Sequence, residues 1–227
     1  MAIPVAAVIG VTVATVAAGR AIRHTRLARQ LARTSRVGLL AGEPVRTVPG
    51  LGPMVAGLLR PEVYCGDDLP ARLSPREQHA VLLHERCHQQ RRDPVRLVAL
   101  EALDRSLGRI PAVRLWVNQA RARLEIRADA YALSQGATRP DLAAALLRLA
   151  DAGVSVGAGF ATVTQQRLEA LLDERPPPAR RPAARAVALS AALVAVVLTT
   201  CAPTSAASHP ELSFAGRCLA GQCNAGS

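Results

Sequence analysis

The stretch SPREQHAVLLHERCH, residues 74–88, decides the fold around which the rest of this chain is organised. Ser74 is a favourable N-cap, Pro75 suits the first helical position, and Glu77 completes a capping box with Ser74. Apolar residues then recur at helical spacing, at Ala80, Leu83 and Cys87. The stretch therefore predicts a well-capped helix. We expect it to end near Arg92, because Pro94 disfavours the helical conformation at the residue before it.

The last five residues of this stretch, His84-Glu85-Arg86-Cys87-His88, form a His-Glu-x-x-His pattern. Residues four apart lie on one face of a helix, so both imidazoles can reach one metal ion while Glu85 lies beside it. Such a pattern arises by chance in roughly one sequence in a couple of hundred, so other segments must support it. The alternative is a solvated helix face with two ordinary histidines.

A second segment supplies the groups that a catalytic zinc site still lacks, since such a site needs a third protein ligand. Residues 112–135 contain neither Gly nor Pro and predict a helix. Glu125 in this helix can be the third ligand. Asp129, one turn further along the same face, can accept a hydrogen bond from the outer nitrogen of a ligating histidine. Without the histidine motif, both carboxylates would be interpreted as ordinary surface charges that pair with nearby arginines at helical spacing.

Further motifs between Pro61 and Leu172 carry a family resemblance. They are a Leu-Ser-Pro-x-Glu lead into the motif helix, Asp93-Pro94 after the second histidine, Pro111 to Trp116 running into Glu125 to Asp129, and Arg-Leu-x-x-Leu at 167–171. In this combination the chain resembles the gluzincin zinc metallopeptidases. It is most similar to the BlaR1/MecR1-like membrane metallopeptidases of peptidase family M56, and next to the M48 (HtpX/Ste24-like) family.

The resemblance implies a Zn²⁺ enzyme in which His84, His88 and Glu125 bind the metal and Glu85 is the general base and acid. Glu85 would take a proton from water and deliver it to the leaving amine of a protein or peptide substrate, with a transcriptional repressor as a candidate substrate. It also implies a mainly α, gluzincin-like domain with a small β hairpin or edge strand. No oxyanion-stabilising residue is assigned, although Tyr131 and Arg127 are available.

Two uncharged runs, Ala2–Gly19 and Ala186–Ala202, predict transmembrane helices near the lower length limit, with short buried helices as the alternative. Arginines follow the first run and precede the second, so residues from about 20 to 185 are expected in the cytoplasm and both termini outside. The basic residues come after the first run, which favours an uncleaved anchor over a signal peptide.

The expected organisation between and beyond the membrane segments is simple. Short apolar pieces at 54–59 and 62–65 predict the hairpin or edge strand, and helices are expected at 95–107 and 141–152. The predicted units are a transmembrane helix 1–19, a basic juxtamembrane helix 20–37, a zinc metallopeptidase domain 38–174, a Pro/Arg linker 175–185, a transmembrane helix 186–202 and a tail 203–227.

The formal charge of +11 does not indicate a nucleic-acid-binding protein. All its basic residues are Arg, they are dispersed, and aromatic residues make up only 2%, too few to interleave with them. Cys65 and Cys87 fall in the expected cytoplasmic part, whereas Cys218 and Cys223 fall in the tail, where they could form a disulfide.

The sequence thus predicts a multi-pass, membrane-anchored zinc metalloendopeptidase that acts in regulatory proteolysis on the cytoplasmic side. A quality-control protease of the M48 type and a non-catalytic membrane scaffold are the alternatives.

Overall fold

Helices account for most of the computed structural model, which describes residues 5–151, 165 and 167–172. The elements are α1 (Val5–Thr34), β1 (Arg36–Leu40), β2 (Glu43–Thr47), β3 (Met54–Ala56), β4 (Glu62–Cys65), α2 (Leu69–Arg72), α3 (Pro75–Gln90), α4 (Asp93–Leu107), α5 (Pro111–Ser134) and α6 (Arg139–Asp151). Residues 167–172 are also helical and are called the C-terminal segment below. The expectation of a mainly α fold with a small sheet is confirmed.

Helix α3 begins as its sequence predicts. The Ser74 hydroxyl accepts a hydrogen bond from the backbone N–H of Glu77, and the Glu77 carboxylate accepts one from the backbone N–H of Ser74 at 2.8 Å. The helix ends at Gln90, slightly before the expected end at Arg92. Arg92 adopts a left-handed conformation with φ of 53°, and Pro94 lies in the first turn of α4, where its missing N–H is not needed.

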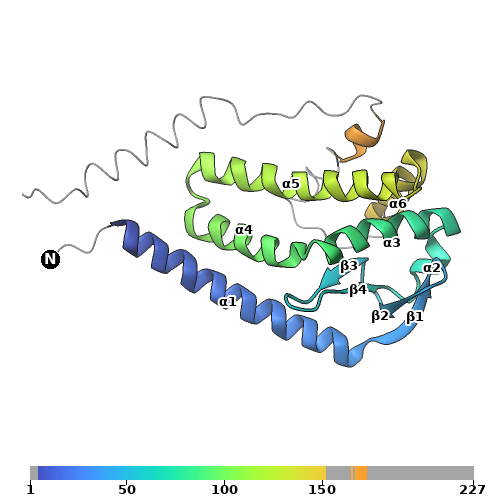
Figure 1. Cartoon of the computed structure of the whole chain (residues 1–227), viewed down its shortest axis with the longest axis horizontal. Helices are drawn as coiled ribbons and strands as arrows, with labels where there is room; N and C mark the ends of the chain where they lie inside the picture. Colours follow the sequence, from blue (N-terminus) through green and yellow to red (C-terminus); the bar gives the residue numbers. More distant parts are fainter. Residues whose placement is uncertain (1–4, 152–164, 166, 173–227) are drawn as a thin grey trace, which may run out of the picture.

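The helices after α3 lie close to their expected positions and surround it. Figure 1 shows α5 running alongside α3 and α4, with α1 on the opposite side of α4. The contacts between elements agree, because α3 packs against α5 and α6, and α4 packs against α1 and α5. Helix α3 therefore lies between the sheet and the other helices, which brings its faces into contact with both.

The sheet has four strands in the order β1-β2-β4-β3. The expected hairpin is present as β3 and β4, which pair antiparallel, while β2 pairs parallel to β4. The hairpin of β1 and β2 was not predicted. Its strands contain Gly38 and Pro44, which disfavour strands, so their pattern resembled a loop. Ala41 and Gly42 form its two-residue turn with positive φ at both positions, as a type I′ turn requires.

Helix α1 joins the first uncharged run and the basic segment into one helix. The predicted juxtamembrane helix to residue 37 is too long, because the helix ends at Thr34 and residues 36 and 37 belong to β1. Within the described residues, no helix has both the length and the hydropathy to cross a membrane. The second predicted span, the linker, and the tail with Cys218 and Cys223 lie outside the described residues.

The core between the sheet and α3 is apolar and holds the helix in place. Buried residues of the sheet, of the α2 region and of α3 form one cluster, which includes Leu40, Val63, Cys65, Leu69 and Leu82. A second cluster joins α3, α5, α6 and the C-terminal segment through Ala80, Ala132, Leu142, Ala143 and Leu171. Two faces of α3 are thus packed in apolar surroundings.

Replacing Ser74 by Ala should lower the free energy of unfolding by about 1 kcal/mol, because an N-cap hydrogen bond of α3 is lost. Chemical denaturation of the full chain measures this change. Ser134→Ala is the control, since this exposed hydroxyl bonds the Tyr131 carbonyl at the far end of α5. Equal effects of the two changes would contradict a special role for the α3 cap.

Candidate metal centre

Two histidines of α3 and one glutamate of α5 converge where these helices pack together. The Nε2 atoms of His84 and His88 lie 3.1 Å apart. One carboxylate oxygen of Glu125, Oε2, lies 3.3 Å from Nε2 of His84. The other, Oε1, lies 3.6 Å from Nε2 of His88. One donor atom from each residue lies within 4.8 Å of the others, so the three can hold one metal ion.

Small side chains bring the two helices close enough for this convergence. Ala80 on α3 and Ala132 on α5 are fully buried in the same cluster, and Ala128 of α5 is also fully buried. Small side chains at these positions let the helix axes approach closely, so α5 can present Glu125 directly to the α3 histidines.

The outer nitrogens of both histidines are bound by carboxylates. Nδ1 of His84 lies 2.8 Å from Asp129, and Nδ1 of His88 lies 2.9 Å from Asp93. An ionised carboxylate only accepts hydrogen bonds, so each Nδ1 carries the hydrogen and each Nε2 faces Glu125. This is the arrangement that orients metal-ligating histidines in proteins, and it fits the donor set to a metal ion. Asp129 lies where the sequence had suggested.

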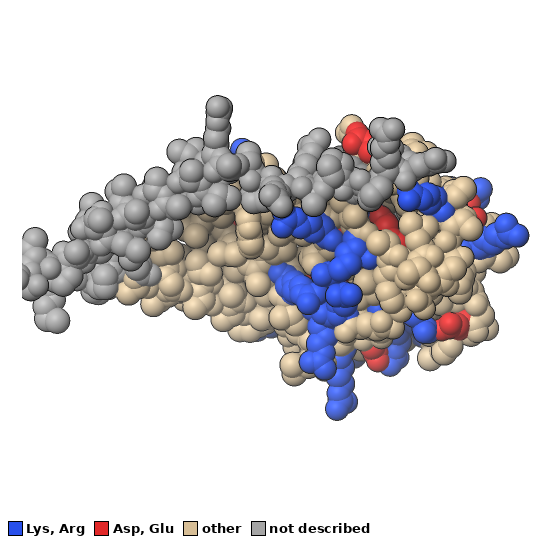
Figure 2. Space-filling view, turned by 45° about the horizontal axis from the view of Figure 1, so that its top comes forward, with Lys and Arg blue, Asp and Glu red and all other residues tan. Residues whose placement is uncertain are grey.

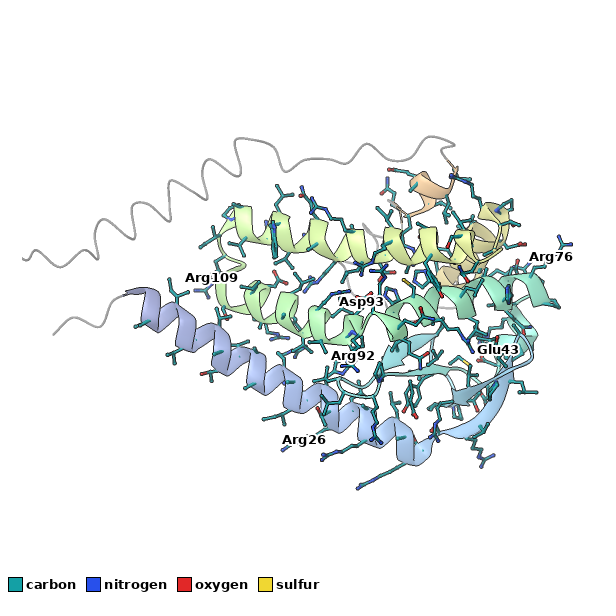
Figure 3. All side chains as sticks on the ribbon, in the orientation of Figure 1. Arg26, Glu43, Arg76, Arg92, Asp93 and Arg109 are labelled. Atoms are coloured by element: carbon teal, nitrogen blue, oxygen red, sulfur yellow. The ribbon has the colours of Figure 1, made fainter. Side chains whose placement is uncertain are left out.

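Asp93 is a residue whose role the sequence did not reveal, although it is part of the family pattern. It is fully buried at the junction of α3 and α4 (Figure 3). Besides His88 it accepts hydrogen bonds from Arg96 and from Arg127, the latter at 3.0 Å. It lies beyond the end of α3, so helical spacing could not place it. The left-handed Arg92 turns the chain so that Asp93 faces back to His88.

Arg167 is the second residue that was missed. Its guanidinium donates to both oxygens of Asp129, at 2.9 and 2.7 Å, and lies 3.2 Å from Glu125. The sequence offered only its place in the Arg-Leu-x-x-Leu motif. Arg127, which had been available as an oxyanion partner, is hydrogen-bonded to Asp93 instead.

Glu85 is buried next to His84, and this burial has an electrostatic consequence. Burial raises the pKa of its carboxyl group, and the charge of Glu125 acts in the same direction, whereas His84 and His88 oppose the shift. A raised pKa brings a carboxylate nearer to neutral pH, where it can both accept and return a proton.

The two histidine ligand candidates hold protons strongly in the metal-free protein, whereas Glu125 stays ionised. Burial acts to lower the pKa of His88, but its hydrogen bond to Glu125 and the charges of Glu85 and Glu125 outweigh this and raise it to about 9. Burial would raise the pKa of Glu125, but hydrogen bonds from His84 and His88 hold it well below its ordinary value. A metal ion and a proton therefore compete for the Nε2 atoms of the two histidines.

We expect the stabilisation by bound metal to increase with pH. The pKa of His88 is raised above its ordinary 6.5, so the protonated ring stabilises the metal-free fold below that pH, and this contribution is lost as the pH rises through about 9. Metal binding must displace the proton, so it strengthens over the same range. The difference in melting temperature between zinc-loaded and chelator-treated protein should widen from pH 6.5 to about 8.5. A constant or narrowing difference would exclude this competition.

Replacing Asp93 by Asn should weaken metal binding by about 10- to 100-fold, because the charged acceptor that orients His88 is lost. Competition with a chromophoric chelator measures the dissociation constant. Asp104→Asn is the matched control, because Asp104 pairs with Arg121. Within the described residues, no hydrogen bond joins Asp104 to His84, His88 or Glu125. If Asp93→Asn binds metal as tightly as this control, Asp93 does not support the site.

The two described cysteines take no part in this cluster. Cys65 and Cys87 are both free and buried. Burial raises the pKa of the Cys65 thiol to about 11 and also raises that of Cys87. Neither belongs to the group of possible metal ligands found among the described residues, so Cys87 has the role of a small buried residue.

Comparison with known proteins agrees with the geometry of the site. No significant match to the chain is found among curated proteins or among solved structures. The model of the family described as BlaR1 peptidase M56 matches residues 4–175 and so extends further toward the N-terminus than the resemblance seen from Pro61 onward. Since this match covers well over half of the 227 residues, the chain belongs to the BlaR1 peptidase M56 family of metallopeptidases.

Proposed function

We propose that this protein is a zinc metalloendopeptidase in which His84, His88 and Glu125 are the metal ligands and Glu85 is the general base and acid. The observation that carries the proposal is the convergence of these three donors beside a buried glutamate in a chain of the M56 family. Two imidazoles and one carboxylate are a ligand set that zinc uses in hydrolytic sites, where a fourth position stays open.

A zinc ion at this site would supply two effects, a lower pKa for water and polarisation of the substrate carbonyl. The protein supplies the rest. Glu85 accepts a proton from the attacking water and returns it to the amine of the departing peptide. Asp93 and Asp129 keep the histidine rings oriented with their Nδ1 hydrogens occupied. The apolar packing around α3 holds these groups in place before substrate binds.

The proposal includes a membrane location and a regulatory substrate. The N-terminal half of α1 carries no charge and exposes the apolar side chains of Val8, Ile9 and Val11. Its C-terminal half is basic. Figure 2 shows arginine side chains gathered in a band across one face of the described part. An uncharged anchor followed by arginines supports attachment with residues after Gly19 on the cytoplasmic side. The substrate is then a cytoplasmic protein, with a transcriptional repressor as the candidate.

Glu85→Gln should reduce peptide-bond cleavage by about 10²- to 10⁴-fold while the protein still binds zinc, because only the proton-transfer group is removed. Hydrolysis of a fluorescently labelled unfolded protein by the full chain measures activity, and elemental analysis measures zinc. Glu101→Gln on α4 is the control, since Glu101 pairs with Arg20 and Arg105.

Two results would refute the proposed function. One is a wild-type protein that binds no zinc. The other is a Glu85→Gln variant that cleaves as fast as wild type and Glu101→Gln.

A further inference from the structure

Arg167 is a buried charged side chain that reaches the candidate metal centre from outside the helices that carry it. Its exposed fraction is 8%, and it belongs to the C-terminal segment, 38 positions after Asp129 in the chain. A guanidinium is costly to bury unless carboxylates pair with it and accept its hydrogen bonds. Here Asp129 and Glu125 provide these partners, so the cost of burying the guanidinium is offset.

We infer that Arg167 is a positioning residue of the metal site, which orients the ligand Glu125 and, through Asp129, the ligand His84. The inference rests on the proposed function, and goes beyond it by making the C-terminal segment a required part of the site. Arg167 contacts the two carboxylates, and its Nη2 also lies 3.3 Å from Nδ1 of His84, the nitrogen that does not face the metal position. It therefore acts on the ligands and not on substrate.

The contact with Asp129 fixes the plane of that carboxylate. Nε of Arg167 donates to one oxygen and Nη2 to the other, so the pair forms a two-pronged contact. The oxygen bound by Nη2 is the same one that accepts from Nδ1 of His84. The planar fork of arginine matches a carboxylate in one orientation, which prevents Asp129 from rotating away from the histidine.

The contact with Glu125 restrains the proposed ligand itself. The Glu125 oxygen near Arg167, at 3.2 Å, is also the one that lies 3.3 Å from Nε2 of His84. Its other oxygen lies toward His88. Arg167 also brings a positive charge among Glu85, Glu125 and Asp129, whose mutual repulsion in a buried site would otherwise separate them.

The C-terminal segment has anchors that do not depend on Arg167. Leu168 and Leu171 pack in the cluster formed with Ala80, Ala132 and Leu142. The guanidinium of Arg139 donates to the carbonyl of Ala170 at 3.1 Å. The segment can therefore stay docked when residue 167 is changed, which separates loss of positioning from loss of folding.

The test compares Arg167→Met and Arg167→Lys in the full chain. Arg167→Met should weaken zinc binding by about 10- to 100-fold and change the visible absorption of the cobalt-substituted protein, because Glu125 and His84 are no longer held. It should lower kcat more than it changes KM. Arg167→Lys keeps the charge without the fork, so we expect a smaller loss of affinity and a cobalt spectrum that still differs from wild type.

Matched controls come from another arginine–aspartate pair, which joins Arg121 of α5 to Asp104 of α4. Arg121→Met and Arg121→Lys alter an arginine that pairs with Asp104, and both should retain the zinc affinity and cobalt spectrum of wild type. Leu171→Ala should lower the melting temperature by loosening the segment. In an Asp129→Asn background, Arg167→Met should cause a smaller loss of zinc affinity than it does in wild type, because part of its effect passes through Asp129.

The outcomes separate this inference from the proposed function. A wild type that binds zinc and cleaves substrate, beside an Arg167→Met variant with the same zinc affinity and cobalt spectrum, overturns the inference alone. A wild type that binds no zinc overturns both. If Arg167→Met does not fold, the Arg167→Lys variant is used to test the inference. If its zinc affinity and cobalt spectrum are the same as those of Arg121→Lys, the inference is overturned.

Discussion

Close packing of α3 against α5 is the constraint on which the site depends. The histidines and Glu85 lie on one helix and Glu125 on the other, so their donor atoms meet only if the helices approach closely. Buried alanines on both helices allow this approach, and apolar residues on the sheet side and the α6 side of α3 hold it there. The chemistry at the centre is thus positioned by apolar packing around it.

The charged groups at the centre form two hydrogen-bonded chains, each running from a histidine to an aspartate and on to an arginine. The imidazoles of His84 and His88 are backed by Asp129 and Asp93, and each of these aspartates is in turn backed by arginine, Arg167 in one case and Arg127 in the other. Burying these aspartates and arginines is tolerable because each faces an opposite charge with hydrogen-bonding geometry. Such a network holds the rings in one orientation before any metal binds.

Several features could be predicted because they depend on residues near one another in sequence. The capping box of α3, the helical character of 112–135 and the facing of His84 and His88 follow from helix geometry alone. The β1–β2 hairpin was missed because Gly38 and Pro44 obscured its alternation. Asp93 was missed as a partner of His88 because the intervening Arg92 leaves the helical conformation, and no periodic pattern extends across such a break.

By itself, the sequence determined the motif helix, its N-terminal cap, the pair of histidines with Glu85 and the nomination of Glu125 and Asp129. These follow from local spacing, since a helix repeats every few residues. Only the tertiary structure decided that α5 lies against α3, that Asp93 turns back to His88 and that Arg167 closes the network. Those contacts join residues far apart in sequence, and which of many possible long-range pairs forms is decided by how the buried faces pack together and by which buried charges can be paired.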